Sequence, residues 1–224
     1  MTSTDAPRLV ENCPQAAPSP SGEACPTAEC PEQDSDQDSL TGADELNVFS
    51  YFRKPITNTN PMAKVGLHLV YNLIKDDVFK KPTHVLRLIE DEEKARSYKA
   101  THFDYCTFSG VFSRRDSKCL KEHSGLLCLD FDHLDDPKAL KLALLADKFF
   151  ETQLAFISPS GNGLKWIIPI EVSPLVTHEK WFTAVRNYIE QAYKVNVDPS
   201  GRDVARACFL PHDPDVYLNP KLLL

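Results

Sequence analysis

The chain has 224 residues, 42% of them hydrophobic, and a formal net charge of −7. This length allows one ordinary domain with a tail or two small domains, and no apolar run approaches the roughly 18 residues of a membrane helix. The first 45 residues carry −9, which leaves +2 on the other 179. The acidic total therefore does not exclude a nucleic-acid partner for the body of the chain.

Residues 1–45 are predicted to be a disordered acidic tail. They hold six prolines and many Ser, Thr, Gln and Asp residues without a periodic apolar pattern. Such a segment cannot bury enough apolar surface to offset its ordering entropy. No secretory signal is visible, and the seven cysteines are irregularly spaced, which favours a reducing cytoplasm over a disulfide scaffold.

Residues 46–122 are predicted to form a small α/β unit. Its expected elements are a strand over 46–51, a helix from 61 to 77, a second helix over 83–96 and a hairpin over 103–112. A basic loop follows the hairpin with Arg114, Arg115 and Lys118. These side chains either contact a nucleic-acid strand or belong to an ordinary solvated surface.

Residues 123–224 are predicted to form a second α+β unit with alternating element types. Strands are expected at 125–132, 154–158, 164–172 and 205–211, with helices at 136–150 and 178–195. This β-α-β-β-α-β order is that of RRM-like and ferredoxin-like folds. In that topology the first strand lies between the third and the fourth, antiparallel to both, so its carboxyl end meets the segments that begin near residues 163 and 198.

Two aspartates end the first of these strands, in the sequence Leu127–Asp132. Asp130 and Asp132 are two residues apart, so a strand places both carboxylates on one face. Hard oxygen ligands at a rigid strand end suit Mg²⁺ or Mn²⁺. The alternative is a strand that runs out into an acidic turn, since Asp135 and Asp136 follow.

The topology brings further polar groups to the same edge. The turn after the second strand can offer backbone N–H groups to an anion, although ordinary turns use the same residue types. Asp198 supplies a third carboxylate, so that a divalent-metal centre for phosphoryl transfer is expected. The predicted nucleotide-phosphate contacts are Ser158, Ser160, Gly161, Asn162, Gly163, Lys165 and Arg206.

These stretches resemble the archaeo-eukaryotic primase superfamily, with its strand ending in Asp-x-Asp, its Ser-Gly-x-Gly turn and a later aspartate. Residues 108–112, 127–132, 158–165 and 198–219 more closely resemble the VirE amino-terminal domain family of primase-like modules from bacterial mobile elements. The resemblance covers residues 46–224. It implies an RRM-like catalytic core with Asp130, Asp132 and Asp198 as metal ligands.

The resemblance also implies a function. The expected activity is nucleotidyl transfer from an NTP or dNTP, with Mg²⁺ or Mn²⁺ and single-stranded nucleic acid, in replication of a mobile element. Primase-polymerases usually carry histidine where this chain has Lys165, so the alternative is a catalytically inactive nucleic-acid-binding or helicase-docking module. No Gly-x-x-x-x-Gly-Lys-Ser/Thr stretch is present, so a helicase-like ATPase is expected as a separate chain or as a missing C-terminal part.

Overall fold

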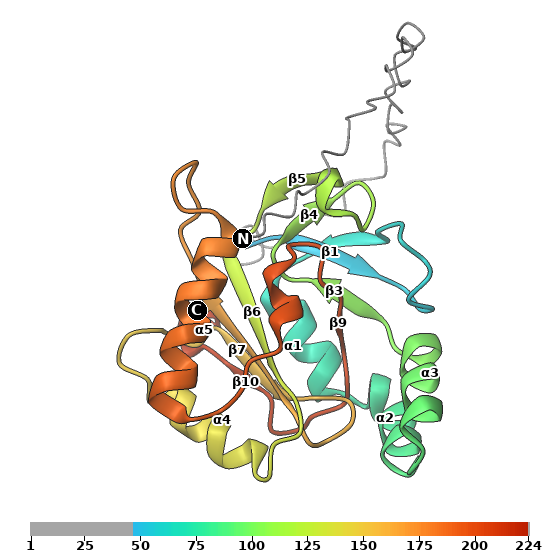
Figure 1. Cartoon of the computed structure of the whole chain (residues 1–224). Helices are drawn as coiled ribbons and strands as arrows, with labels where there is room; N and C mark the ends of the chain where they lie inside the picture. The colour runs from blue at the N-terminus through green and yellow to red at the C-terminus, as the bar shows by residue number, and fades with distance from the viewer. Residues whose placement is uncertain (1–46, 224) are drawn as a thin grey trace, which may run out of the picture. The chain divides into compact units, whose positions relative to one another are not determined.

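The computed structural model describes residues 47–223, and within this range the protein is a mixed α+β structure with antiparallel sheets and five α-helices (Figure 1). The prediction of a disordered tail over residues 1–45 lies outside the described residues. No helix within 47–223 is long and apolar enough to cross a membrane.

The N-terminal part of the described chain contributes three strands of a four-stranded sheet, a separate two-stranded ribbon and three helices. The sheet has the order β2-β1-β3-β9, in which β9 (Cys208–Phe209) comes from near the C-terminus, and β4 pairs with β5 in the ribbon. The bounds are β1 Phe49–Phe52, β2 Ala63–Val65, α1 Leu67–Lys75, α2 Lys80–Arg87, α3 Glu92–His102, β3 Tyr105–Thr107, β4 Gly110–Phe112 and β5 Leu120–His123.

Three expectations for this part are wrong. Residues 63–65 pair with β1 as a strand, so the first helix begins only at Leu67. The helix expected over 83–96 is two helices, because the Asp91 carboxylate accepts a hydrogen bond from the backbone N–H of Lys94 and starts α3 there. Residues 103–112 do not form a hairpin, since β3 pairs with β1 and β9 while β4 pairs with β5.

The second sheet has the order β10-β7-β8-β6. Antiparallel pairing aligns β6 with β8 over six residues and β7 with β8 over four. The order β6-α4-β7-β8-α5 agrees with the sequence prediction. The bounds are β6 Leu126–Phe131, α4 Pro137–Leu145, β7 Leu154–Ile157, β8 Leu164–Pro169, α5 His178–Tyr193, β9 Cys208–Phe209 and β10 Tyr217–Leu218.

The fourth strand of the predicted RRM-like sheet is not where the sequence placed it. Of residues 205–211 only Cys208 and Phe209 form a strand, and they pair with β3 of the other sheet. The 3₁₀ turn Pro199–Arg202 lies against β6 instead, since a Cβ on Gly201 would come within 3.1 Å of the Cys128 carbonyl oxygen. The far edge of the sheet is completed by β10, which pairs with β7.

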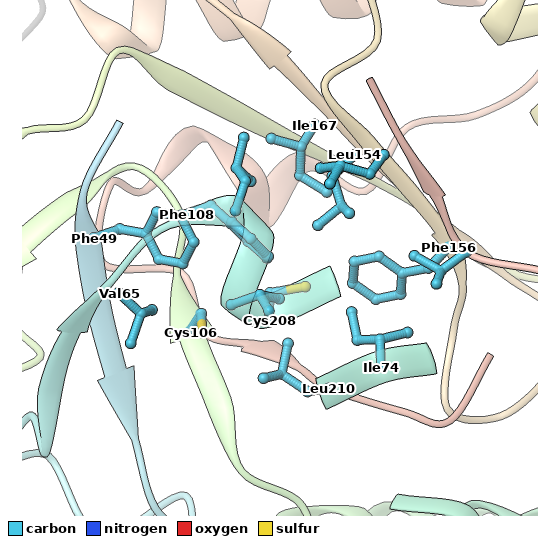
Figure 2. Packing of buried hydrophobic residues seen from close by; sticks show 14 of the residues in the cluster. Phe49, Val65, Ile74, Cys106, Phe108, Leu154, Phe156, Ile167, Cys208 and Leu210 are labelled. Atoms are coloured by element: carbon cyan, nitrogen blue, oxygen red, sulfur yellow. The ribbon is translucent and has the colours of Figure 1, made fainter. Parts of the chain in front are cut away.

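The two faces of the second sheet pack on different partners. Leu127, Leu129 and Phe131 point towards α4 and α5 in one apolar cluster. The alternate residues of β6 point the other way, where Leu126 joins a cluster with residues of α1 and of the first sheet (Figure 2). Asp130 belongs to this second set by the alternation of a strand. The acidic end of β6 therefore faces the N-terminal part of the described chain.

A pair of histidines joins the β4–β5 ribbon to the Pro199–Arg202 turn. The Gly125 N–H donates to His123 Nδ1 at 3.0 Å, and His123 Nε2 lies 3.1 Å from His178 Nδ1. His178 Nε2 lies 3.2 Å from the Gly201 carbonyl oxygen, which can only accept, so His178 donates there and His123 donates to His178. Both rings are thus neutral in this arrangement.

Protonating this pair is expected to destabilise the fold. Burial and the neighbouring His178 lower the pKa of His123 to about 4, while an unfolded histidine titrates near about 6.5. The unfolded chain therefore binds more protons between these values, and stability should fall as the pH drops from about 6.5 towards 4. Thermal denaturation across this range checks the prediction. His123→Gln keeps a hydrogen-bond donor that does not titrate, so its melting temperature should fall less steeply with decreasing pH than that of the wild type. An equally steep fall would mean that other groups cause the pH dependence.

Candidate metal and nucleotide site

Three carboxylates meet at the end of β6. One oxygen each from Asp130, Asp132 and Asp198 lies within 4.8 Å of the other two. Like charges this close repel unless a cation or a proton lies between them. The sequence analysis named these three residues as metal ligands, and the fold brings them together.

Asp198 lies on the segment between α5 and the Pro199–Arg202 turn. Helix α5 ends at Tyr193, and Lys194 follows in the left-handed conformation with φ 58°. The chain then returns along β6, where the Asp198 N–H donates to the Asp130 carbonyl oxygen at 2.9 Å. The Asp198 carboxylate accepts from the Ser200 N–H at 2.9 Å and the Ser200 hydroxyl at 2.6 Å.

Charge and hydrogen bonding favour the ionised form of Asp198. Arg206 forms an ion pair with its Oδ2 atom at 3.0 Å. Burial acts to raise the pKa of Asp198, but the hydrogen bonds from Ser200 and the charge of Arg206 outweigh it, so that the pKa lies below its ordinary value. Asp198 is thus a carboxylate at neutral pH and available as an anionic ligand.

Asp130 and Lys165 form a buried ion pair. They are directly opposite each other on β6 and β8, and the Lys165 ammonium contacts Asp130 Oδ2. The two residues are only 8% and 9% exposed. Burial acts to lower the pKa of Lys165, but the carboxylate of Asp130 outweighs it and the pKa lies above its ordinary value. The sequence predicted Lys165 as a contact of the nucleotide phosphates, whereas in the fold its ammonium contacts a carboxylate.

The other oxygen of Asp130 has no partner. Asp130 Oδ1 is buried and forms no hydrogen bond with the described residues. Burial raises the pKa of Asp130, with Lys165 opposing the shift. Asp132, by contrast, is exposed and forms no hydrogen bond or ion pair within residues 47–223. The orphaned oxygen and the uncommitted carboxylate together fit a hard divalent cation such as Mg²⁺ or Mn²⁺.

The turn between β7 and β8 lies beside these carboxylates. The Ser158 N–H donates to the Gly163 carbonyl oxygen at 2.8 Å, and the Gly161 N–H donates to the Ser158 carbonyl oxygen at 2.9 Å. Gly161 has φ +88°, a conformation that glycine adopts without strain. The Ser158 and Ser160 hydroxyl oxygens are 3.4 Å apart. Ser158 is buried, while Ser160 and Asn162 are exposed at the rim.

Gly163 sets how closely the turn approaches β6. A Cβ there would lie 2.5 Å from the Phe131 carbonyl oxygen and 2.9 Å from Ser158 Oγ. Gly163→Ala should therefore push the turn away from Asp132 and cost about 1–3 kcal/mol, the usual range for overpacking. Ser160→Ala, at an exposed position, is the matched control and should stay within about 0.5 kcal/mol. Chemical denaturation measures both, and equal stabilities of the two variants would contradict the close packing.

A cleft lined by Asp130 and Asp132 opens in two adjoining lobes of about 440 Å³ each, and Asp198 lines neither lobe. Arg96, Lys99, Asp132 and Ser160 line both lobes. The first, here the β9 lobe, is also lined by Ile56, Arg115, Asp130, Ser158, Pro159, Lys165, Asp203, Ala205, Arg206, Ala207 and Phe209. The second, here the α2 lobe, is also lined by Leu86, Arg87, Ile89, Glu90, Glu92, Ala95, His133 and Asn162.

The predicted nucleic-acid contacts divide between the cleft and the outer surface. Arg115 lines the β9 lobe, where its guanidinium donates to Tyr105 Oη and to the Ile56 carbonyl oxygen, both at 3.2 Å. Arg114 donates instead to Thr59 Oγ1 at 3.2 Å, and Lys118 is exposed. Neither Arg114 nor Lys118 lines the cleft.

Three basic residues of the cleft were not among the predicted site residues. Arg87 donates to the carbonyl oxygens of Pro159 at 3.3 Å and Ser158 at 3.4 Å, and these hydrogen bonds link the end of α2 to the turn. Arg96 and Lys99 come from α3 on the opposite wall. Their spacing of three residues on one helix face was the available signal.

Residues 98–218 match the family described as "BT4734-like, N-terminal domain". This match spans more than half of the 224 residues. The chain belongs to this family. The assignment to the VirE amino-terminal domain family is therefore wrong, because the matching family is a different one. The BT4734-like region contains the three carboxylates, the Ser158–Gly163 turn and Lys165.

No curated protein and no solved structure matches this chain. The description of the BT4734-like domain names no substrate or reaction. A functional conclusion therefore depends on the geometry of the site.

Proposed function

We propose that this chain is the core of a divalent-metal-dependent nucleotidyltransferase of the primase-polymerase kind, which adds nucleotides from an NTP or dNTP to a nucleic-acid chain. The observation that carries the proposal is the cluster of three carboxylates, one of which, Asp130, has a buried Oδ1 without a hydrogen-bond partner among the described residues. A buried, unpaired carboxylate oxygen beside two further carboxylates is costly unless it has a ligand.

The donor set is suited to this chemistry. Asp130, Asp132 and Asp198 would hold Mg²⁺ or Mn²⁺, since both metals prefer carboxylate oxygens. When bound, the metal stabilises negative charge on the attacking and leaving oxygens of a phosphoryl transfer. The Ser158–Gly163 turn places hydroxyl and backbone groups beside Asp132 for contact with the phosphates.

The fold supports the same proposal at a finer level. The order β6-α4-β7-β8-α5, with β6 antiparallel to β8, is the order of the first five elements of an RRM-like core. In the proposed relation, the Pro199–Arg202 turn takes the place of the fourth strand beside β6. The β9 lobe, with Arg115 at its side, would receive single-stranded nucleic acid.

The biological setting remains that expected from the sequence. We propose a cytoplasmic role in replication of a mobile genetic element, together with a helicase-like ATPase. The Asp-x-Asp strand end and the Ser-Gly-x-Gly turn, which lie side by side in the fold, support the nucleotide chemistry of this proposal.

One observation favours a second candidate, a catalytically inactive nucleic-acid-binding or helicase-docking module. The Lys165 ammonium already contacts Asp130, and a lysine in this position supplies part of the positive charge that a metal would bring. In such a module the acidic edge would be neutralised from within the chain, and the cleft would bind nucleic acid without chemistry.

An extension assay separates the two candidates. The purified protein would be incubated with a primed or unprimed single-stranded DNA template, Mn²⁺, and NTPs or dNTPs. Metal-dependent extension products from the wild type would support the nucleotidyltransferase proposal. No product from the wild type, but product from Lys165→His, would mean that lysine suppresses catalysis; no product from either, with template binding intact, favours the binding module.

A further inference from the structure

Most basic side chains in the β9 lobe already have partners. Lys165 contacts the Asp130 carboxylate, and Arg206 forms its ion pair with Asp198 at 3.0 Å. Arg115 donates to Tyr105 and Ile56, and its guanidinium carbon lies 5.4 Å from the centre of the Tyr105 ring. These cations balance carboxylates or hold the lobe together, so they are not the best placed to take the phosphates of a ligand.

Arg96 and Lys99 differ from them in this respect. Neither forms a hydrogen bond or an ion pair with any residue of the described range, and both line both lobes of the cleft. They are three residues apart on α3, so they project from the same side of the helix. Lys94, on the same helix, differs from both residues, because its side chain is 79% exposed and forms an ion pair with Asp91 at 3.6 Å.

The Lys99 ammonium is held over the cleft. It lies 5.9 Å from the centre of the Phe209 ring, in a cation–π arrangement, and Phe209 lines the β9 lobe. Burial and the charge of Lys165 lower the pKa of Lys99, while Asp132 and Asp130 oppose this shift. The ammonium therefore faces the carboxylates across the cleft without contacting them. An anion that carries a divalent cation could bind between them, with its oxygens on the ammonium and its cation on the carboxylates.

The distribution of acidic residues indicates where this anion lies. The α2 lobe is also lined by Glu90 and Glu92 and the β9 lobe by Asp203, carboxylates that would repel a polyphosphate. The junction of the two lobes carries Arg96, Lys99 and Ser160 beside the single exposed carboxylate of Asp132. An anion with a bound divalent cation fits this junction, since the cation meets the carboxylates and the outer oxygens meet α3.

We infer that Arg96 and Lys99 form a phosphate-binding wall on α3, which holds the polyphosphate of a metal-bound nucleotide opposite the Ser158–Gly163 turn. This inference rests on the proposed function for the identity of the ligand. It assigns the phosphate contacts to a helix in which no sequence motif indicates a site. It leaves Lys165 and Arg206 in their ion pairs with the carboxylates that hold the metal.

The test measures binding rather than catalysis. Calorimetry would determine the dissociation constants of Mg²⁺-tripolyphosphate and of Mg²⁺-ATP for the wild type, Arg96→Ala, Lys99→Ala and the double variant. Each single change removes one charge-assisted contact and should weaken both ligands by about ten-fold to one hundred-fold. Lys94→Ala, on the same helix but away from the cleft, should change neither constant by more than about two-fold.

Thermal denaturation keeps the result interpretable. Helix α3 has no buried residue, and alanine favours a helix. All these variants should therefore have the same melting temperature as the wild type. A double variant that binds both ligands like the wild type overturns the inference, as does a wild type that binds neither. Wild-type binding that depends on Arg96 and Lys99, in a protein without any extension activity, would keep the inference while removing the proposed reaction.

Discussion

Asp132→Asn is expected to remove nucleotide extension and to weaken Mn²⁺ binding by on the order of 100-fold or more, without loss of thermal stability. Asp132 is exposed and has no hydrogen bond or ion pair within the described residues, so its carboxylate contributes little to the fold. Its removal also relieves repulsion with Asp130 and Asp198, and the melting temperature of the metal-free protein should stay equal or rise slightly.

Asp130→Asn should lose the same activity for the same reason but carry a second effect. Lys165 would be left buried opposite a neutral side chain, and an unpaired buried charge costs about 3–5 kcal/mol. Both variants should thus lose activity, but only Asp130→Asn should also be destabilised. The matched control is Asp135→Asn, an exposed carboxylate three residues beyond Asp132, which should leave both quantities unchanged. Wild-type Mn²⁺ affinity in Asp132→Asn would remove this residue from the metal site.

The elements from β6 to α5 could be predicted well from sequence because they have strong local signals. The apolar run of β6 and the amphipathic pattern of α5 are long enough for periodicity to identify them. Gly161 and Gly163 marked the turn between β7 and β8 by their conformational and steric demands. The antiparallel β6–β8 pair then followed from the order of the elements.

The errors arose where pairing between distant segments decides the structure. Strands β3, β4 and β9 have only two or three residues each, too few for a period. Strands β3 and β9 exist because partners far along the chain supply their hydrogen bonds, whereas β4 pairs with the nearby β5 and not with β3. Local sequence could not indicate that Cys208 and Phe209 leave the second sheet for the first.

The carboxylate cluster was predicted although part of the reasoning for it was wrong. Asp198 was expected beside Asp130 on the loop that leads to a fourth strand. It lies there on a segment that ends in a 3₁₀ turn capped by its own side chain, without that strand following in the same sheet. The α3 wall was not predicted, because the expected helix over 83–96 excluded Lys99. Recognising Asp91 as the N-cap would have moved the helix to Glu92–His102 and put Arg96 and Lys99 on one face.

Lys165→Ala is expected to destabilise the metal-free protein by about 3–5 kcal/mol, because Asp130 would lose the cation that compensates its burial. Urea denaturation at neutral pH measures the loss. The control is Lys221→Ala, which removes the exposed ion pair between Lys221 and Glu151, whose side chains are 75% and 49% exposed. Exposed pairs contribute at most about 1 kcal/mol, so the two lysines should differ clearly.

Mn²⁺ should restore part of the stability lost in Lys165→Ala. In this variant neither oxygen of Asp130 would have a partner among residues 47–223, so the three carboxylates attract a divalent cation more strongly than they do beside the ammonium. Ligand binding to the folded state alone raises its stability, so the Mn²⁺-induced rise in melting temperature should be larger for Lys165→Ala than for the wild type. A larger rise would show that lysine and metal compete for one acidic site. A Lys165→Ala protein that gains nothing from Mn²⁺, while Lys221→Ala behaves as the wild type, would mean that the cluster does not bind divalent metal, and the nucleotidyltransferase proposal would fail with it.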